Sequence, residues 1–313
     1  LADRHSTAPQ YTVDTGPLRF TVSRKAFNLF ESAWLDQNGD GKFTDDELYV
    51  APSPENGSVI TAAGWEGQGI KDGTKFYNSA TPPRKVVVEE SGPMRVTLLA
   101  DGMHAPRGVD AARADPFYDY RVRITAYAGK PYVKVGYAIG NTQCRPEQYA
   151  WPMKEASLVT RLKTEGMTVA VFLSDTTQMI NPPYAHPGQG QNFAWEGKSR
   201  MLGARSSDAH VLMLQDSSGG NEWKNLRPNG HARRIFGGAT VPGVTFRGWK
   251  VWRAGKETYS GLRSPGLVDF RHNDNDKTKE RGIIVTVRDF WQNYPKGFEA
   301  DKDALSIKVF PKE

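Results

Sequence analysis

The sequence predicts a mainly β protein, in which a small N-terminal β domain precedes a large antiparallel β-sandwich. Apolar and polar residues alternate through 118–126, and a second alternating segment at 132–139 follows the turn sequence AGKP. The 313 residues also include 31 glycines and 20 prolines. A period of two residues is typical of half-buried strands, and frequent Gly and Pro indicate many turns.

The region before residue 80 is expected to be built from β segments. The apolar residues of SRKAFNLFESAWL (23–35) fit either a short helix or a strand. The following LYVAPSP (48–54) cannot be a helix, because two prolines interrupt it. The loop-rich YNSATPPRK (77–85) marks the expected boundary, which gives domains at 8–80 and 83–313.

The sandwich strands are predicted from alternation and from short apolar runs. One face of 118–126 is formed by Tyr118, Tyr120, Val122, Ile124 and Ala126. After the turn, 132–139 would pair with this strand as a long hairpin. Further strands are expected at 93–100, 167–174, 210–215, 283–290 and 305–310. A short helix is expected at most at 146–156, where Pro152 interrupts it.

Composition excludes several classes of function. The formal net charge of +6 is spread along the chain without a Lys/Arg block, so we expect acidic partners but no nucleic acid. No apolar run approaches the length of a membrane span. A single cysteine, Cys144, excludes an intrachain disulfide. The chain begins at Leu1 without a signal peptide, as expected of a mature form or an excised piece.

The stretch DQNGDGKFTDDE (36–47) matches a calcium loop of the EF-hand type. Gly41 at position 6 permits the sharp bend that such a loop needs. The expected Ca²⁺ ligands at positions 1, 3, 5, 7 and 12 are Asp36, Asn38, Asp40, the backbone carbonyl of Lys42, and Glu47. The alternative is a simple turn, because Asn, Gly and Asp favour turns.

The surroundings of this loop suggest a structural ion instead of a calcium sensor. The prolines after the loop leave no room for the exit helix of a true EF-hand. We therefore expect Ca²⁺ to stabilise a turn between β segments. Cytosolic free calcium is too low to fill an isolated loop, so the loop favours a secreted protein, extracellular or periplasmic.

Three longer phrases resemble the exo-rhamnogalacturonan lyase (YetA-like) family. They are TGPLRFTVSRKAFNLFESAWLDQNGDGKF (15–43), YRVRITAYAGKPYVKVGYAIGN (120–141) and VTVRDFWQNYPKGFEADKDALSIKVFP (285–311). The resemblance implies a small N-terminal β-barrel of the RIFT type, a central β-sandwich and a C-terminal α/α toroid. This sequence covers the first two, so a separate toroid domain or self-assembly is an expected partner.

The resemblance implies β-elimination on rhamnogalacturonan, an acidic polysaccharide of pectin. A uronate lyase needs a cation for the carboxylate, a base and an acid. In RDFWQNY (288–294), Arg288 would clamp the carboxylate and Tyr294 would act as acid or base, while Trp291 and Asn293 would contact the sugar. The alternative is a packed core segment with a structural Arg–Asp ion pair.

A second cluster lies in NGHARRIF (229–236). His231 is the candidate base, and Arg233 and Arg234 would bind an anionic sugar. The alternative is a solvated loop with incidental charges. His104 with Arg107 is a third candidate of the same kind, and His186 lies in a loop rich in Pro and Gly.

Two functions remain open from the sequence. The first is the β-domain portion, or a relative, of a rhamnogalacturonan lyase. The second is a non-catalytic extracellular protein that binds carbohydrate or serves assembly with the same β domains.

Overall fold

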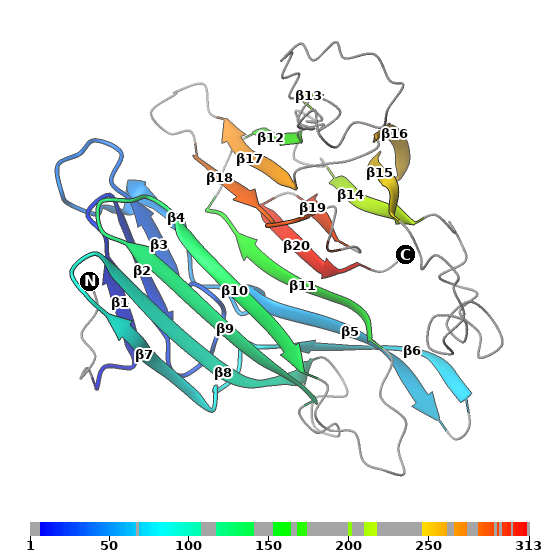
Figure 1. Cartoon of the computed structure of the whole chain (residues 1–313), viewed down its shortest axis with the longest axis horizontal. Helices are drawn as coiled ribbons and strands as arrows, with labels where there is room; N and C mark the ends of the chain where they lie inside the picture. The colour runs from blue at the N-terminus through cyan, green and yellow to red at the C-terminus, as the bar shows by residue number, and fades with distance from the viewer. Residues whose placement is uncertain are drawn as a thin grey trace, which may run out of the picture. The chain divides into compact units, whose positions relative to one another are not determined.

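Antiparallel strands build this protein (Figure 1). The computed structural model describes residues 7–66, 69–107, 117–140, 153–163, 168–173, 200–201, 210–217, 246–261, 266–273, 281–290, 293, 296–301 and 303–311. Packing divides the chain into two units, Leu1–Glu165 and Gly166–Glu313. In the described ranges the helical structure is a single 3-10 turn, η1 (Asp45–Glu47). The predicted mainly β fold class is confirmed.

The first sheet of unit 1 contains four strands in the order β1-β2-β3-β4. Their bounds are β1 (Gln10–Asp14), β2 (Leu18–Ser23), β3 (Ser32–Leu35) and β4 (Leu48–Val50). A tight turn with Gly16 at φ +100° joins β1 to β2, a conformation that glycine adopts without steric cost. The end of the ambiguous segment 23–35 is therefore a strand, β3.

A second group of strands in unit 1 contains β7 (Lys85–Ser91), β8 (Arg95–Arg107), β9 (Phe117–Tyr127) and β10 (Val133–Gly140). β8 pairs with β7 and β9, and β9 pairs with β10 from Val133↔Ala126 to Gly140↔Asp119. On β9, the five residues predicted to share one face are all buried. The predicted hairpin is confirmed.

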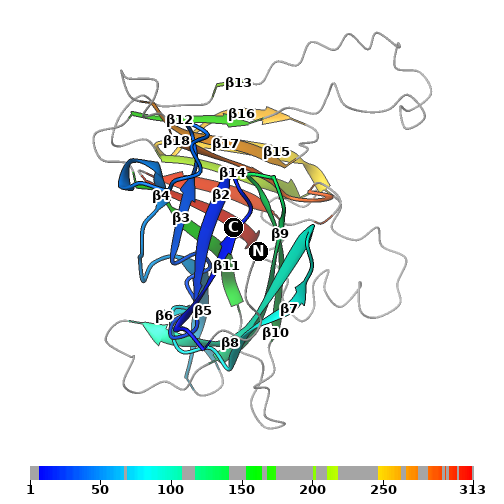
Figure 2. The same ribbon diagram turned by 90° about the vertical axis from the view of Figure 1, so that its left-hand side faces the viewer.

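The two groups of strands form a sandwich in unit 1, visible as separate layers in Figure 2. One buried apolar cluster joins them. It includes Val13 and Phe20 from the first sheet, and Leu98, Val122 and Ile124 from the second. The boundary expected near residue 80 lies within unit 1, and side chains from both sides of it share this core.

The sheet that contains β7, β8, β9 and β10 extends further, because the end of β8 also pairs with β6 (Gly69–Asn78). The extension contains β6, β5 (Gly57–Glu66) and β11 (Met153–Arg161), in the order β8-β6-β5-β11. A smaller buried cluster with Ile60, Tyr77 and Tyr118 lies here. The last residues of the short helix expected at 146–156 belong instead to β11, because their backbone pairs with β5.

Unit 2 contains two antiparallel sheets. The first, β20-β19-β14-β15-β16, comprises β14 (His210–Ser217), β15 (Phe246–Arg253), β16 (Lys256–Gly261), β19 (Gly297–Asp301) and β20 (Ala304–Phe310). The second, β13-β12-β17-β18, comprises β12 (Thr168–Leu173), β13 (Arg200–Met201), β17 (Leu267–Asn273) and β18 (Arg281–Thr286). The strands predicted at 210–215 and 305–310 are thus present. Of the strand predicted at 283–290, the first part, as far as Thr286, belongs to β18.

Phe290 connects these two sheets. It follows β18, is 1% exposed and stacks on Phe298 of β19 with ring centroids 5.2 Å apart. Gln215 of β14 donates a hydrogen bond to the Phe290 carbonyl at 2.7 Å. Gly266 lies against the Phe290 ring so closely that no side chain fits between them. Within the described part of the chain, no helix is long and apolar enough to cross a membrane.

Candidate functional site

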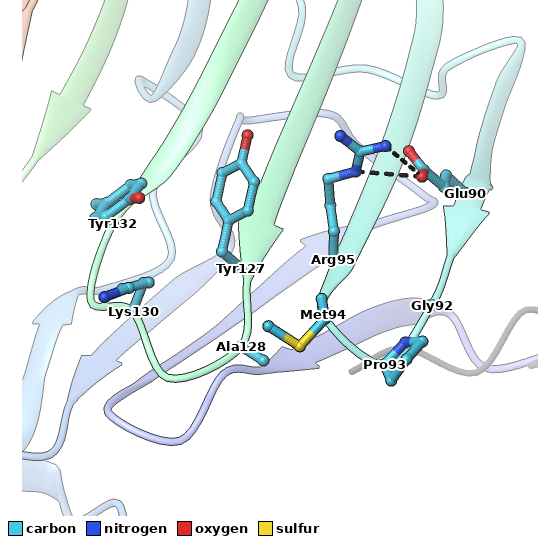
Figure 3. A pocket seen from close by; sticks show the side chains of 9 residues that line it. All are labelled: Glu90, Gly92, Pro93, Met94, Arg95, Tyr127, Ala128, Lys130 and Tyr132. Atoms are coloured by element: carbon cyan, nitrogen blue, oxygen red, sulfur yellow. Dashed lines mark hydrogen bonds and ion pairs between the residues drawn. The ribbon is translucent and has the colours of Figure 1, made fainter.

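An open groove lies in unit 1, where the β7–β8 turn meets the β9–β10 turn (Figure 3). The two turns are neighbours because β8 pairs with both β7 and β9, which places Arg95 opposite Tyr127. The Ala128 N–H donates to the Met94 carbonyl at 3.0 Å and joins the turns directly. Gly129 at φ +70° allows the second turn to reverse tightly.

The groove has a volume of about 490 Å³ and exposes aromatic and apolar side chains. The rings of Tyr127 and Tyr132 lie 5.7 Å apart and are tilted by 46°. Tyr132 is 55% exposed and Met94 is 71% exposed. Amphipathic rings of this kind present an apolar face and a hydroxyl that hydrogen-bonds, which is the combination that a sugar ring with its hydroxyl groups requires.

Two cations border these rings. Arg95 pairs with Glu90 at 2.5 Å, and both side chains are about half exposed. Exposed pairs of this type contribute only about 0–1 kcal/mol to stability, so a ligand carboxylate can replace Glu90 at little cost. Lys130 is exposed on the β9–β10 turn, and among the described residues no carboxylate pairs with its ammonium group. The groove can therefore bind an acidic, ring-shaped ligand.

The loop at 36–47 has the backbone that its sequence predicts. Gly39 and Gly41 adopt φ of +75° and +74°. The Asp36 carboxylate accepts the N–H groups of both glycines, at 2.7 and 2.9 Å. The Asn38 and Asp40 side chains accept the N–H groups of Asp40 and Lys42, each at 2.8 Å. Side chains at positions 1, 3 and 5 thus organise the turn from its interior.

Glu47 closes this loop. It is 5% exposed, and its carboxylate accepts the N–H groups of Gln37 and Thr44, both at 3.1 Å. The last ligand position is thereby held beside the first residues of the loop. Thr44 caps η1, and with Glu47 it forms a capping box that fixes the Glu47 side chain.

The carboxylates of the loop bind N–H groups here and do not converge on one point. Across the described ranges, no three His, Cys, Asp or Glu side chains are grouped to hold a metal ion. Two expected ligands, Asn38 and the Lys42 carbonyl, are neutral oxygens outside those residue types. Carboxylate oxygens that accept a single N–H retain a second lone-pair site, whereas Glu47 Oε2 accepts both the N–H and the hydroxyl of Thr44. The donor set is composed of oxygens, as calcium requires, and the calcium site stays a prediction.

The predicted cluster at 288–294 is only partly described. The Arg288 side chain is 88% exposed and pairs with the adjacent Asp289 at 3.3 Å. Asn293 lies beside it, since its N–H donates to the Asp289 carbonyl at 2.9 Å. Trp291 and Tyr294 lie outside the described residues. The structure therefore brings Arg288 and Asn293 together on an exposed turn, next to the buried Phe290.

The predicted His231, Arg233 and Arg234, together with His186, also lie outside the described residues. His104 is described, and it is fully buried, with its ring bonded to Ser58 and to the Tyr118 carbonyl. A substrate cannot reach it in this position. His104 is accordingly a structural residue of the unit 1 interior.

The groove residues were missed in the sequence. Tyr127 and Tyr132 flank the predicted turn AGKP, so one signal was present: two aromatic residues on either side of a hairpin turn. No local sequence pattern indicated that the β7–β8 turn would line the groove, because its position there depends on the pairing of β8 with β9. Searches against models of protein families and against curated proteins found no match to this chain.

Proposed function

We propose that this chain binds an acidic polysaccharide through the groove at the β7–β8 and β9–β10 turns. The observation that carries the proposal is the pair formed by the exposed Tyr132 and the half-buried Tyr127, with Lys130 and Arg95 beside it. The rings would stack on sugar faces, and the cations would pair with uronate carboxylates. The ligand class is rhamnogalacturonan or a related pectic chain, in line with the family resemblance of the sequence.

We further propose that binding serves β-elimination, with this chain as the β-domain portion of a rhamnogalacturonan lyase or of a relative. In this proposal the catalytic residues are Arg288, Tyr294 and His231, and the residues that bind the substrate are Trp291, Asn293, Arg233 and Arg234. The competing proposal is a non-catalytic extracellular module for carbohydrate binding or assembly. The groove supports both, because each requires recognition of an acidic sugar chain.

The binding proposal is tested with rhamnogalacturonan and the variant Tyr132→Ala. Loss of the exposed ring is expected to weaken binding about 10-fold, which corresponds to ~1.4 kcal/mol. Phe76→Ala is the matched control, because Phe76 is 53% exposed and Tyr132 is 55% exposed. Equal binding by Tyr132→Ala and the wild type, or an equal loss in Phe76→Ala, would overturn the proposed site.

The charge requirement is tested by chemical reduction of the uronate carboxyl groups. The reduced polysaccharide is expected to bind weakly, and Lys130→Ala is expected to lose part of the salt dependence of binding. The absorbance of an unsaturated uronate then separates the two functions. Product formation, alone or after addition of a toroid domain, supports the lyase, and tight binding without product under either condition supports the non-catalytic module.

We also propose that the loop at 36–47 holds Ca²⁺ through Asp36, Asn38, Asp40, Lys42 and Glu47, and that the protein is located outside the cytoplasm. The support is the fit of the loop: two glycines with positive φ and a buried closing glutamate. When bound, the ion would neutralise three carboxylates and stabilise the turn between β3 and β4. It has no role in the binding groove.

A further inference from the structure

A row of three ionisable side chains crosses neighbouring strands of unit 2. His210 Nε2 on β14 lies 2.6 Å from Glu299 Oε1 on β19. The other carboxylate oxygen, Glu299 Oε2, lies 2.6 Å from Lys308 Nζ on β20. None of these residues was singled out by the sequence, because they are distant in the chain and no local motif connects them.

Strand register explains why the three meet. Glu299 pairs with Leu212 of β14 and with Ser306 of β20, so His210 and Lys308 are its diagonal neighbours. Residues two apart on a strand share a face, and diagonal neighbours are within reach of long side chains. The intervening Val211 and Met213 are buried on the opposite face. His210 and Glu299 are partly exposed on the other face, and Lys308 beside them is buried.

The hydrogen bond to Glu299 decides which tautomer a neutral His210 adopts. Burial by itself would raise the pKa of Glu299, but the Lys308 ammonium and the His210 donor outweigh burial and lower it. An ionised carboxylate only accepts hydrogen bonds. The proton of neutral His210 must then be on Nε2, which leaves the lone pair of Nδ1 available to accept a proton.

The surroundings provide contacts for a ligand. The His210 side chain is 35% exposed, and no described residue hydrogen-bonds to its Nδ1. Trp252 of β15 is partly exposed opposite Leu212, on the same face. Lys250 follows on that face, where it pairs with Glu257 at 3.4 Å. Two acids besides Glu299 lie on this face: Asp301, opposite His210, and Glu257, opposite Trp252.

We infer that His210, in place of His231, is the general base of the proposed elimination, with Trp252 and Lys250 contacting the acidic sugar. This inference rests on the proposed function. Nδ1 would take the proton from the carbon that bears the uronate carboxylate. The C–H electron pair would form the new C=C bond as the neighbouring C–O bond breaks. The departing glycosidic oxygen would take a proton from water. Glu299 and Lys308 are positioning residues, because they act through the imidazole.

The experiment compares wild type with His210→Gln on rhamnogalacturonan oligosaccharides, measuring both binding and unsaturated product. Loss of a general base is expected to reduce product formation by about 100-fold or more. The amide of Gln can still donate to Glu299, so the fold is expected to persist, and a melting curve checks this. Ile284→Ala, an exposed residue of β18, is the surface control with unchanged activity.

Glu299→Gln tests positioning through a readout other than activity. Nitrogen-15 chemical shifts of the His210 ring should report the Nε2–H tautomer in the wild type and a mixture in the variant. Unchanged product formation in His210→Gln, or no product from wild type at any pH, would overturn the inference. In either case, binding that depends on Tyr132 would leave the polysaccharide-binding proposal intact, whereas loss of binding in the wild type would refute that proposal itself.

Discussion

His104 and Ser58 are hydrogen-bonded at 2.6 Å in the interior of unit 1, where both are fully buried. The Ser58 hydroxyl also contacts the Tyr137 hydroxyl, and the other ring nitrogen of His104 lies 2.7 Å from the Tyr118 carbonyl. A polar chain thus runs through the packed interior and connects β5, β8, β9 and β10. Both ring nitrogens of a neutral His104 imidazole have a hydrogen-bond partner. A charged imidazole at this buried position would be unfavourable.

We predict that the free energy of unfolding decreases as the pH is lowered from about 6.5 to about 4. Burial outweighs the Tyr118 bond and the nearby Asp119, and lowers the pKa of His104 from 6.5 to about 4. In this pH range His104 is protonated in the unfolded chain but stays neutral in the folded chain. The free energy of unfolding therefore decreases by up to about 3 kcal/mol. Denaturant unfolding at successive pH values measures the loss.

The contribution of His104 is isolated by His104→Gln, whose unfolding free energy should depend less on pH. If His104→Gln does not fold, an NMR titration of the wild-type His104 ring answers the same question. A midpoint near pH 6.5 would contradict the prediction.

The contact between Gly266 and Phe290 gives a second prediction. A Cβ at Gly266 would lie 2.3 Å from Phe290 Cβ, and the residue has φ +72°. Gly266→Ala is expected to cost about 3 kcal/mol or more, from overpacking together with backbone strain. Urea unfolding followed by tryptophan fluorescence would measure this loss.

Gly255→Ala is the matched control for the Gly266 variant. Gly255 has a similar φ of +76°, but nothing lies within 4 Å of a Cβ there. Only the backbone strain remains, so the expected cost is about 1–2 kcal/mol. Equal losses in the two variants would show that the Phe290 contact does not determine the stability of unit 2.

Calcium removal gives a third prediction. An ion that binds the folded loop and not the unfolded chain stabilises the folded state, so a chelator should lower the melting temperature. At an ion concentration 100-fold above Kd, the loss is about 2.7 kcal/mol, which corresponds to roughly 5–10 °C for a unit of this size. Differential scanning calorimetry with and without chelator measures it.

Asp36→Ala should reproduce the effect of the chelator and abolish any further response to it. Asp45→Asn is the control, because position 10 of the loop supplies no expected ligand and the Asp45 side chain is exposed. Identical melting curves of the wild type with and without chelator would count against the calcium site.

The strand predictions were confirmed where alternation was local and complete. On β9 every predicted inward residue, from Tyr118 to Ala126, is buried, because a half-buried strand requires a period of two. The segment 23–35 was ambiguous because its apolar pattern fits the period of a helix and that of a strand. Its last four residues form the strand β3 because they pair with β2. The expected short helix at 146–156 gave way at Met153 to pairing with β5.

The sequence indicates a candidate site only where the residues of that site are close together in the chain. The loop from Asp36 to Glu47 could be recognised because its twelve positions determine its own turn. The groove joins turns from two hairpins, and His210 and Glu299 are 89 residues apart. His104 was considered as a candidate base, and it is instead a buried partner of Ser58, 46 residues away.

The sequence by itself determined the mainly β fold, the β9–β10 hairpin and the turn at 36–47, since each follows from periodicity or from the conformational preferences of neighbouring residues. Only the tertiary structure decided which turns adjoin, which face of each sheet is exposed and which polar groups share a partner. Strand order and register set these relationships, and they depend on burying apolar surface between distant segments, which no local pattern records.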